Sequence, residues 1–266
     1  MGTALAATAA LCMGAAAPAW GAGLCDGLAG PITVSTAQAN QTCTLSSNAE
    51  LTVNATGSID GQANRAVSVG AGATGVRIDN NGLLTSNSME TIGNAGTIAE
   101  LNNSGTIANT NWDGVFNSGT IGLLHNTGTG TIRADGWGLW NTGTITELRN
   151  AGTIEGSVGL VLHGEVTTLN NTGELLASSS AVQINHLGIV PTFNNSGLIR
   201  GGAGGAGAFA IDNDGALGTL NNSGWIDGRV WSSKAFTLNL QGPTARISGP
   251  VINPGGSVNL QSGATT

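Results

Sequence analysis

Two pairs of acidic residues are the first candidates for chemistry in this sequence. Asp212 and Asp214 stand two residues apart, while Glu100 and Glu147 are separated by a long stretch of chain. Two carboxyl groups can together break a glycosidic bond, as acid and nucleophile when about 5 Å apart and as acid and base when about 6.5 to 9.5 Å apart. Asp212 and Asp214 lie beside Gly215, however, and Asp next to Gly is typical of a turn. We therefore expect no catalysis at that pair.

Other arrangements that support catalysis or cofactor binding are weak or missing. His163 and His186 could share a metal on neighbouring strands, but no third ligand stands near them. No Gly-Asp-Ser-Gly or Gly-x-Ser-x-Gly motif supplies a nucleophile for a serine protease or an esterase. Two Gly-x-Gly-x-x-Gly matches, over 70–75 and 202–207, do not open a helix, as dinucleotide binding requires. The sequence therefore predicts no catalytic, cofactor or metal site.

A repeat supplies the elements that would position any such groups. Pairs of glycines recur every 21 to 27 residues between residues 94 and 226. The earlier glycines are Gly96, Gly119, Gly143, Gly164, Gly188 and Gly215. The later glycines, each nine residues on, are Gly105, Gly128, Gly152, Gly173, Gly197 and Gly224. A repeat of this length indicates a solenoid.

An asparagine stands two positions before each later glycine. Asn and Gly tolerate positive φ better than other residues, so Asn-x-Gly favours a corner in the chain. Because stacked strands lie about 4.8 Å apart, we expect these side chains to form a ladder in which each amide bonds its copies above and below. The ladder residues are Asn103, Asn126, Asn150, Asn171, Asn195 and Asn222.

Apolar residues around the corners supply the expected core. After the earlier corner come Ile98, Ile121, Ile145, Val166, Val190 and Leu217, and three residues further come Leu101, Leu124, Leu148, Leu169, Phe193 and Leu220. A second stretch follows the later corner, with Ile107, Ile132, Ile154, Leu175, Ile199 and Ile226. A third stretch, such as Leu160-Val161-Leu162, precedes the next corner.

A unit of about 23 residues with two corners and three apolar stretches fits one coil of a right-handed parallel β-helix with three short strands. We expect this all-β fold from about residue 30 to residue 260. Glu100 and Glu147 then share a column two coils apart, roughly 9.6 Å by strand spacing, with Leu123 between them. The charged pairs expected in adjacent coils are Arg133 with Glu155 and Arg200 with Asp227.

Aromatic and threonine columns suggest two kinds of contact surface. Phe116 and Trp140 precede successive earlier corners, and we expect their rings to stack in the core. Trp112 and Trp137, if directed outward, would form a short platform for a sugar ring or a partner. Threonines just after the corners suggest an ice- or surface-binding face, but both columns are interrupted, so we expect no flat regular face there. These threonines are Thr97, Thr120 and Thr144 in one column and Thr106 and Thr153 in the other.

Composition agrees with an exported solenoid. Of the 266 residues 44 are glycine, only 9% are charged, and the formal net charge is −7. A chain without a basic patch cannot neutralise phosphates, so we expect no nucleic-acid partner.

Residues 1–22 look like a secretory signal peptide, with an Ala-rich apolar stretch and a small-residue cleavage site but no basic n-region. A transmembrane helix is the competing interpretation. Cys12 would leave with this segment, and the remaining pair, Cys25 and Cys43, is expected to form a disulfide in an exported chain. We expect residues 23–60 to be a disulfide-capped β segment, and residues 61–266 to be a solenoid truncated at its C-terminal end.

The repeat resembles the passenger region of a bacterial autotransporter, the type V secretion family. The motifs that carry the resemblance are Asn-Asn-Ser-Gly-Thr-Ile over 102–107, Asn-Thr-Gly-Thr-Ile over 141–145, Asn-Ala-Gly-Thr-Ile over 150–154, Leu-Asn-Asn-Ser-Gly over 220–224 and Ala-Arg-Ile-Ser-Gly-Pro-Val over 245–251. The resemblance implies export and display at the cell surface or release from it, through a C-terminal outer-membrane barrel, of which we expect no part within this sequence.

Three functions follow as expectations. The first is an adhesion scaffold that contacts a host-cell, matrix or carbohydrate surface, or associates with itself, and that is not an enzyme. The second is a carbohydrate-active β-helix enzyme, a polysaccharide lyase or hydrolase. The third is an ice- or surface-binding solenoid.

Overall fold

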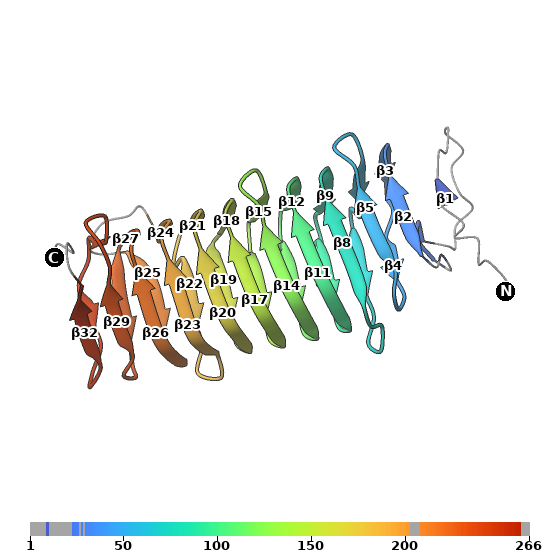
Figure 1. The fold of residues 1–266 in the computed structure, drawn as a ribbon. Coiled ribbons are helices and arrows are strands. Elements are labelled where there is room, and N and C mark those ends of the chain that lie inside the picture. The colour runs from blue at the N-terminus through green and yellow to red at the C-terminus, as the bar shows by residue number, and fades with distance from the viewer. Residues whose placement is uncertain (1–8, 11–22, 27, 29, 203–207, 262–266) are drawn as a thin grey trace.

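The computed structural model describes residues 9–10, 23–26, 28, 30–202 and 208–261. Within these ranges the chain forms 32 strands and no helix, and all the paired strands run parallel. The strands make three sheets, and each coil visits the first, second and third sheet in turn, so the coils stack into a long prism (Figure 1). The predicted parallel β-helix with three strands per coil is confirmed.

The first sheet has twelve strands in the described part of the chain. They are β1 (Ala9–Ala10), β2 (Pro31–Val34), β5 (Glu50–Val53), β8 (Val76–Asn80), β11 (Thr97–Asn103), β14 (Thr120–Asn126), β17 (Thr144–Asn150), β20 (Glu165–Asn171), β23 (Ile189–Asn195), β26 (Ala216–Asn222), β29 (Thr237–Leu240) and β32 (Ser257–Leu260).

The second and third sheets have ten described strands each. The second holds β3 (Ala37–Ala39), β6 (Ser58–Asp60), β9 (Leu83–Ser86), β12 (Thr106–Asn109), β15 (Thr131–Ala134), β18 (Thr153–Gly156), β21 (Glu174–Ala177), β24 (Leu198–Arg200), β27 (Trp225–Asp227) and β30 (Arg246–Ile247). The third holds β4 (Cys43–Leu45), β7 (Val67–Val69), β10 (Ile92–Asn94), β13 (Val115–Asn117), β16 (Trp137–Asn141), β19 (Val158–Leu162), β22 (Val182–Ile184), β25 (Phe209–Asn213), β28 (Arg229–Ser232) and β31 (Val251–Ile252).

The predicted core columns are confirmed. Leu101, Leu124 and Leu148 pair in register in the first sheet, and the column continues through Leu169 and Phe193. All of these side chains are fully buried. The column that follows the later corner, headed by Ile107, is buried in the same way in the second sheet.

One part of the aromatic prediction is wrong. Phe116 and Trp140 are in contact, with ring centroids 4.7 Å apart, but they lie on the outer face of the third sheet and are half-buried. Their neighbours Val115 and Leu139 point inward instead and are fully buried. Alternation along a strand allows only one of two successive residues to face the core.

The predicted asparagine ladder is present at the corner between the first and second sheets. Each Nδ2 donates to the Oδ1 of the next coil, at 2.8 Å from Asn103 to Asn126 and again from Asn126 to Asn150. The chain of bonds continues through Asn171 and Asn195 to Asn222. It also begins one coil earlier than predicted, because Asn80 donates to Asn103 at 2.8 Å.

One corner glycine was placed wrongly from the sequence. Thr131 pairs with Thr106, so Gly130, and not Gly128, occupies the corner that Gly105 occupies one coil earlier. A Cβ on Gly130 would collide with the carbonyl of Asn103, whereas a Cβ on Gly128 would meet no atom closer than 4.0 Å. This coil therefore holds two extra residues at its turn, and the nine-residue spacing to Gly128 is a coincidence of the sequence.

A second buried ladder was not predicted. Asn94 donates to Asn117 at 2.6 Å, and Asn117 donates to Asn141 at 2.7 Å, at the corner between the third and first sheets. All three are buried. Leu162 and Ile184 replace asparagine in the next two coils. The sequence therefore does not show asparagine at this position in every coil, as it does for the first ladder.

The predicted disulfide joins Cys25 to Cys43 at the N-terminal end of the solenoid, with a Cα–Cα distance of 4.6 Å. Both cysteines are buried. Most of the predicted signal peptide, including Cys12, lies outside the described residues, although Ala9–Ala10 pairs with Ile32 and Thr33 of β2. No helix among the described residues is long and apolar enough to cross a membrane.

Reduction of this disulfide should lower the free energy of unfolding by about 3 kcal/mol, because the bond closes a loop of nearly twenty residues in the unfolded chain. Thiol labelling of a chain that starts at Gly23 should find no free thiol without reductant. Urea unfolding with and without reductant measures the effect. Labelling of both cysteines without reductant would contradict the assignment.

Candidate functional site

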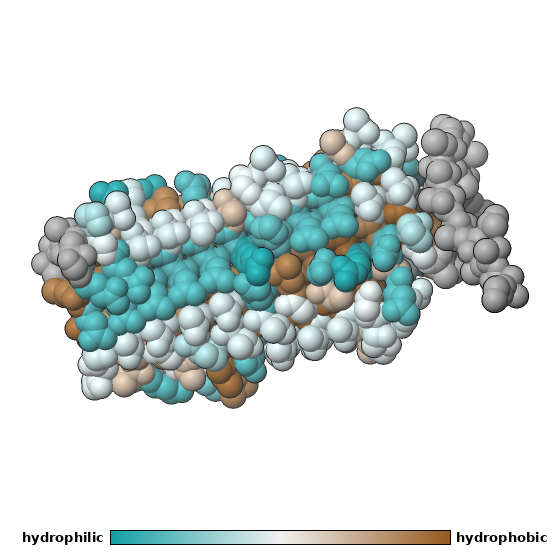
Figure 2. Space-filling model, in the orientation of Figure 1, coloured by the Kyte–Doolittle hydropathy of each residue, from teal (hydrophilic) through white to brown (hydrophobic). Residues whose placement is uncertain are grey.

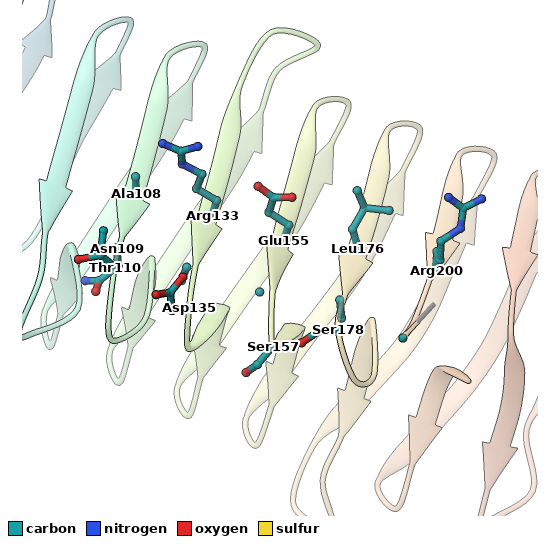
Figure 3. A pocket seen from close by; sticks show the side chains of 14 residues that line it. Ala108, Asn109, Thr110, Arg133, Asp135, Glu155, Ser157, Leu176, Ser178 and Arg200 are labelled. Atoms are coloured by element: carbon teal, nitrogen blue, oxygen red, sulfur yellow. The ribbon is translucent and has the colours of Figure 1, made fainter. Parts of the chain in front are cut away.

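A long open groove runs across five strands of the second sheet, from β12 to β24, with a volume of about 770 Å³ (Figure 3). Five stacked strands span roughly 19 Å along the solenoid axis. The groove is lined by Ala108, Asn109, Thr110, Arg133, Ala134, Asp135, Glu155, Gly156, Ser157, Leu176, Ala177, Ser178, Arg200 and Gly202. It therefore fits the length of an extended polymer better than that of a compact ligand.

Small residues at the ends of the strands make the hollow. Ala134 of β15 pairs with Asn109 of β12, and Gly156 of β18 pairs with Ala177 of β21. Such residues place little side-chain volume over the sheet. Figure 3 shows two rows of larger side chains flanking this floor, one on the strands and one in the turns that follow them. The row on the strands is Arg133, Glu155, Leu176 and Arg200, and the row in the turns is Asp135, Ser157 and Ser178.

The two arginines of the groove differ in how they are held. Arg200 donates from Nε to Oδ2 of Asp227 at 2.8 Å and lies 5.0 Å from the ring centroid of Trp225. The predicted contact between Arg200 and Asp227 is therefore confirmed. Arg133 and Glu155 do pair in the ladder as predicted, yet within the described residues they make neither an ion pair nor a hydrogen bond. Both charged groups are available to a ligand.

Asp135 places a second carboxylate near Glu155. The two residues belong to adjacent coils and are two positions out of register, since Glu155 pairs with Arg133. Strand geometry puts their Cα atoms about 8 Å apart. Sequence reasoning paired Glu155 with Arg133 but did not consider Asp135, which lies in the turn after β15.

The acidic residues singled out from the sequence lie elsewhere. Glu100 forms an ion pair with Arg77, and Glu147 with Arg149, on the outer face of the first sheet. Leu123 of β14 pairs with Glu100 on one side and with Glu147 on the other, so it separates the two glutamates, as expected. The hydrogen bond from Arg149 holds the pKa of Glu147 below its ordinary value, which makes this group a poor proton donor.

Asp212 and Asp214 lie at the end of β25 in the third sheet and in the turn that follows it. Burial raises the pKa of Asp212 above its ordinary value, and the charge of Asp214 raises it further. Asp212 pairs with Gln183 of β22 and with Trp231 of β28 in the third sheet, and it lies outside the groove. The structure thus places this pair at a turn, in agreement with the sequence.

The two histidines have separate surroundings. Nδ1 of His163 accepts a hydrogen bond from Nε1 of Trp140 at 3.0 Å, and its Nε2 lies 2.5 Å from Nδ2 of Asn185. His186 is exposed in the turn after β22, and Ile184, two residues earlier, lies in the same column as Asn141 and Leu162.

Trp112 and Trp137 do not form the platform considered from the sequence. Trp112 is 54% exposed in the turn after β12, two residues beyond Thr110 at one end of the groove. Trp137 instead packs edge-on against Trp140, with ring centroids 4.7 Å apart. The carboxyl group of Asp113, the residue after Trp112, accepts the backbone N–H of Trp137 at 2.9 Å, and burial raises the pKa of this carboxyl group.

The chain matches no protein-family model, and comparisons with curated proteins and with solved structures find no match either.

Proposed function

We propose that this chain is a secreted or surface-displayed passenger scaffold of the autotransporter type, which uses the groove of the second sheet to hold an extended polymer of a host-cell, matrix or carbohydrate surface. The observation that carries the proposal is the groove itself, which crosses five strands and contains three charged groups, Arg133, Asp135 and Glu155, without a protein partner in the described part of the chain. The repeat motifs support the passenger assignment.

The geometry favours a linear ligand. Every lining strand belongs to one parallel sheet, so its groups repeat along the solenoid axis at the strand spacing of about 4.8 Å. Arg133 can donate charge-assisted hydrogen bonds to hydroxyl or carboxylate groups of such a ligand, and Glu155 can accept them from its hydroxyl groups. Trp112 adds an exposed aromatic ring near one end of the groove, where a sugar ring could stack.

Loss of the free charges should weaken binding without affecting the fold. The double variant Arg133→Ala/Glu155→Ala should bind cells or arrayed glycans at least about 100-fold more weakly, since each hydrogen bond to a charged group contributes about 1.5 to 3 kcal/mol, or about 10- to 100-fold. The matched control is Arg149→Ala/Glu147→Ala, which removes an exposed ion pair from the first sheet. Equal binding by both variants and the unchanged chain would exclude the groove.

A second candidate function is cleavage of a polysaccharide, and the pair Asp135 and Glu155 in the groove favours it. Cα atoms about 8 Å apart allow two carboxyl groups to reach the separation at which one protonates the leaving oxygen and the other activates water. Incubation with polysaccharides and a reducing-end assay separates the two functions. A scaffold yields no product, whereas an enzyme yields product that Glu155→Gln abolishes.

A further inference from the structure

Two polar columns stand side by side on the outer face of the first sheet, from β20 to β32. Along each strand, a residue with a hydroxyl group is followed by an apolar residue and then by an asparagine. The hydroxyl column is Thr168, Thr192, Thr219, Thr237 and Ser257. The amide column is Asn170, Asn194, Asn221, Asn239 and Asn259. We call these ten residues the Thr/Asn face.

The register of the Thr/Asn face is unbroken over five coils. Each threonine pairs directly with the next, although the chain takes between 18 and 27 residues to return to the column. The insertions fall at the other sheets and turns. Figure 2 looks onto this side of the molecule, where a hydrophilic band runs without interruption toward the C-terminal end.

The amide column is held in place by its own hydrogen bonds. Asn194 donates to Asn170 and Asn221 donates to Asn194, both at 2.8 Å. Asn239 and Asn259 extend the chain of bonds at 2.7 and 2.8 Å. Each amide thus keeps one orientation, and each retains one N–H and one oxygen lone pair for an outside partner.

The hydroxyl column is stiff and unoccupied. In the described part of the chain, the hydroxyl groups of Thr168, Thr192 and Thr219 make no hydrogen bond within the protein. Threonine is β-branched, so few rotamers are open to it and its hydroxyl group and methyl group stay at defined positions. The face therefore presents donors and acceptors that are already ordered before any ligand arrives.

The array has two repeats, set by the backbone. Along the solenoid axis the groups recur at about 4.8 Å, and across the strand the two columns are separated by about 6.7 Å. None of the ten side chains is charged or aromatic. A single sugar chain usually needs aromatic stacking and an ionic ligand needs charge, so neither matches this face.

We propose that the Thr/Asn face binds the surface of crystalline ice. Ice presents water molecules at fixed lattice positions, each able to donate and accept hydrogen bonds, and a rigid array of hydroxyl and amide groups can order water to continue that lattice. Uncharged groups suit this ligand because charges hold liquid-like hydration shells. The ion pair between Glu147 and Arg149 stands at the N-terminal end of the face, where Asn170 donates to Glu147 at 3.0 Å. The proposal goes beyond adhesion through the groove and is independent of it.

Partition into a slowly growing ice hemisphere tests the proposal. The unchanged chain should be enriched in the ice fraction, whereas serum albumin stays in the liquid. The variant Thr192→Lys/Thr219→Lys, which puts two charges in the array, should fall to the level of albumin. The variant Thr192→Val/Thr219→Val keeps the shape and removes the hydroxyl groups, and its enrichment should drop measurably.

The matched control is Thr120→Lys/Thr144→Lys, on the same sheet but outside the face, which should keep its enrichment in ice. Circular dichroism checks that every variant is folded. Exclusion of the unchanged chain from ice would overturn the proposal, as would equal enrichment of the lysine pair. Loss of binding to microcrystalline cellulose or of clumping between copies, with no ice enrichment in any variant, would assign the face to those partners instead.

Discussion

Replacement of Leu148 by alanine should lower the free energy of unfolding by about 2 to 5 kcal/mol, as expected for a large side chain removed from a close-packed interior. Leu148 is fully buried, and its ladder neighbours above and below are Leu124 and Leu169, which are fully buried as well. The cavity cannot close easily, because the strands on either side are fixed by hydrogen bonds at the strand spacing. Urea unfolding followed by circular dichroism measures the change.

Leu123 provides the matched control for this prediction. It lies one residue before Leu124 in β14, but it faces outward between Glu100 and Glu147 and is only half-buried. Leu123→Ala should therefore cost less than about 1 kcal/mol. Equal destabilisation by the two changes would show that the inward and outward faces of the first sheet are assigned wrongly.

The change Asn171→Ala should destabilise the solenoid strongly, whereas Asn170→Ala should not. Asn171 is buried; it donates to Asn195 at 2.7 Å and accepts from Asn150 at 2.8 Å. Alanine removes both bonds and leaves buried polar groups in two coils without partners, at a cost of about 1 to 3 kcal/mol for each group. Urea unfolding compares the two variants directly.

Asn170 is an informative control because it is the preceding residue of the same strand and also belongs to an asparagine ladder. Its side chain is half-buried on the outer face of the sheet, where water can replace the bonds that it loses, and the expected change is within about 0.5 kcal/mol. A large loss for Asn170→Ala would mean that the outer ladder contributes to stability as much as the buried one.

The fold could be predicted from the sequence because its signal is local and repeated. An Asn-x-Gly corner, a short apolar strand and a return after about 23 residues are visible at each coil, and parallel stacking then places copies of one position in contact. The columns of Leu101 and Ile107 followed from this alone. Gly128 shows the limit of the approach, because two extra residues at one turn moved the true corner to Gly130 without changing the spacing of the asparagines.

The candidate sites could not be predicted in the same way. The pair Asp135 and Glu155 was overlooked although the pairing of Arg133 with Glu155 was expected, because Asp135 lies in the turn after β15, beyond the strand that the repeat predicts. The second asparagine ladder was hidden because it holds asparagine in only three successive coils before Leu162 interrupts it.

The sequence by itself determined the solenoid, its core columns, the buried ladder from Asn103 to Asn222 and the cysteines available for a disulfide, because each depends on residue type and on spacing within a coil. Only the tertiary structure decided what the surface presents. The Thr/Asn face recurs after 24, 27, 18 and 20 residues between Thr168 and Ser257, so no fixed period reveals it. Backbone hydrogen bonds between parallel strands absorb these differences in the turns and bring the side chains into line. The groove likewise exists because small residues from separate coils meet on one sheet.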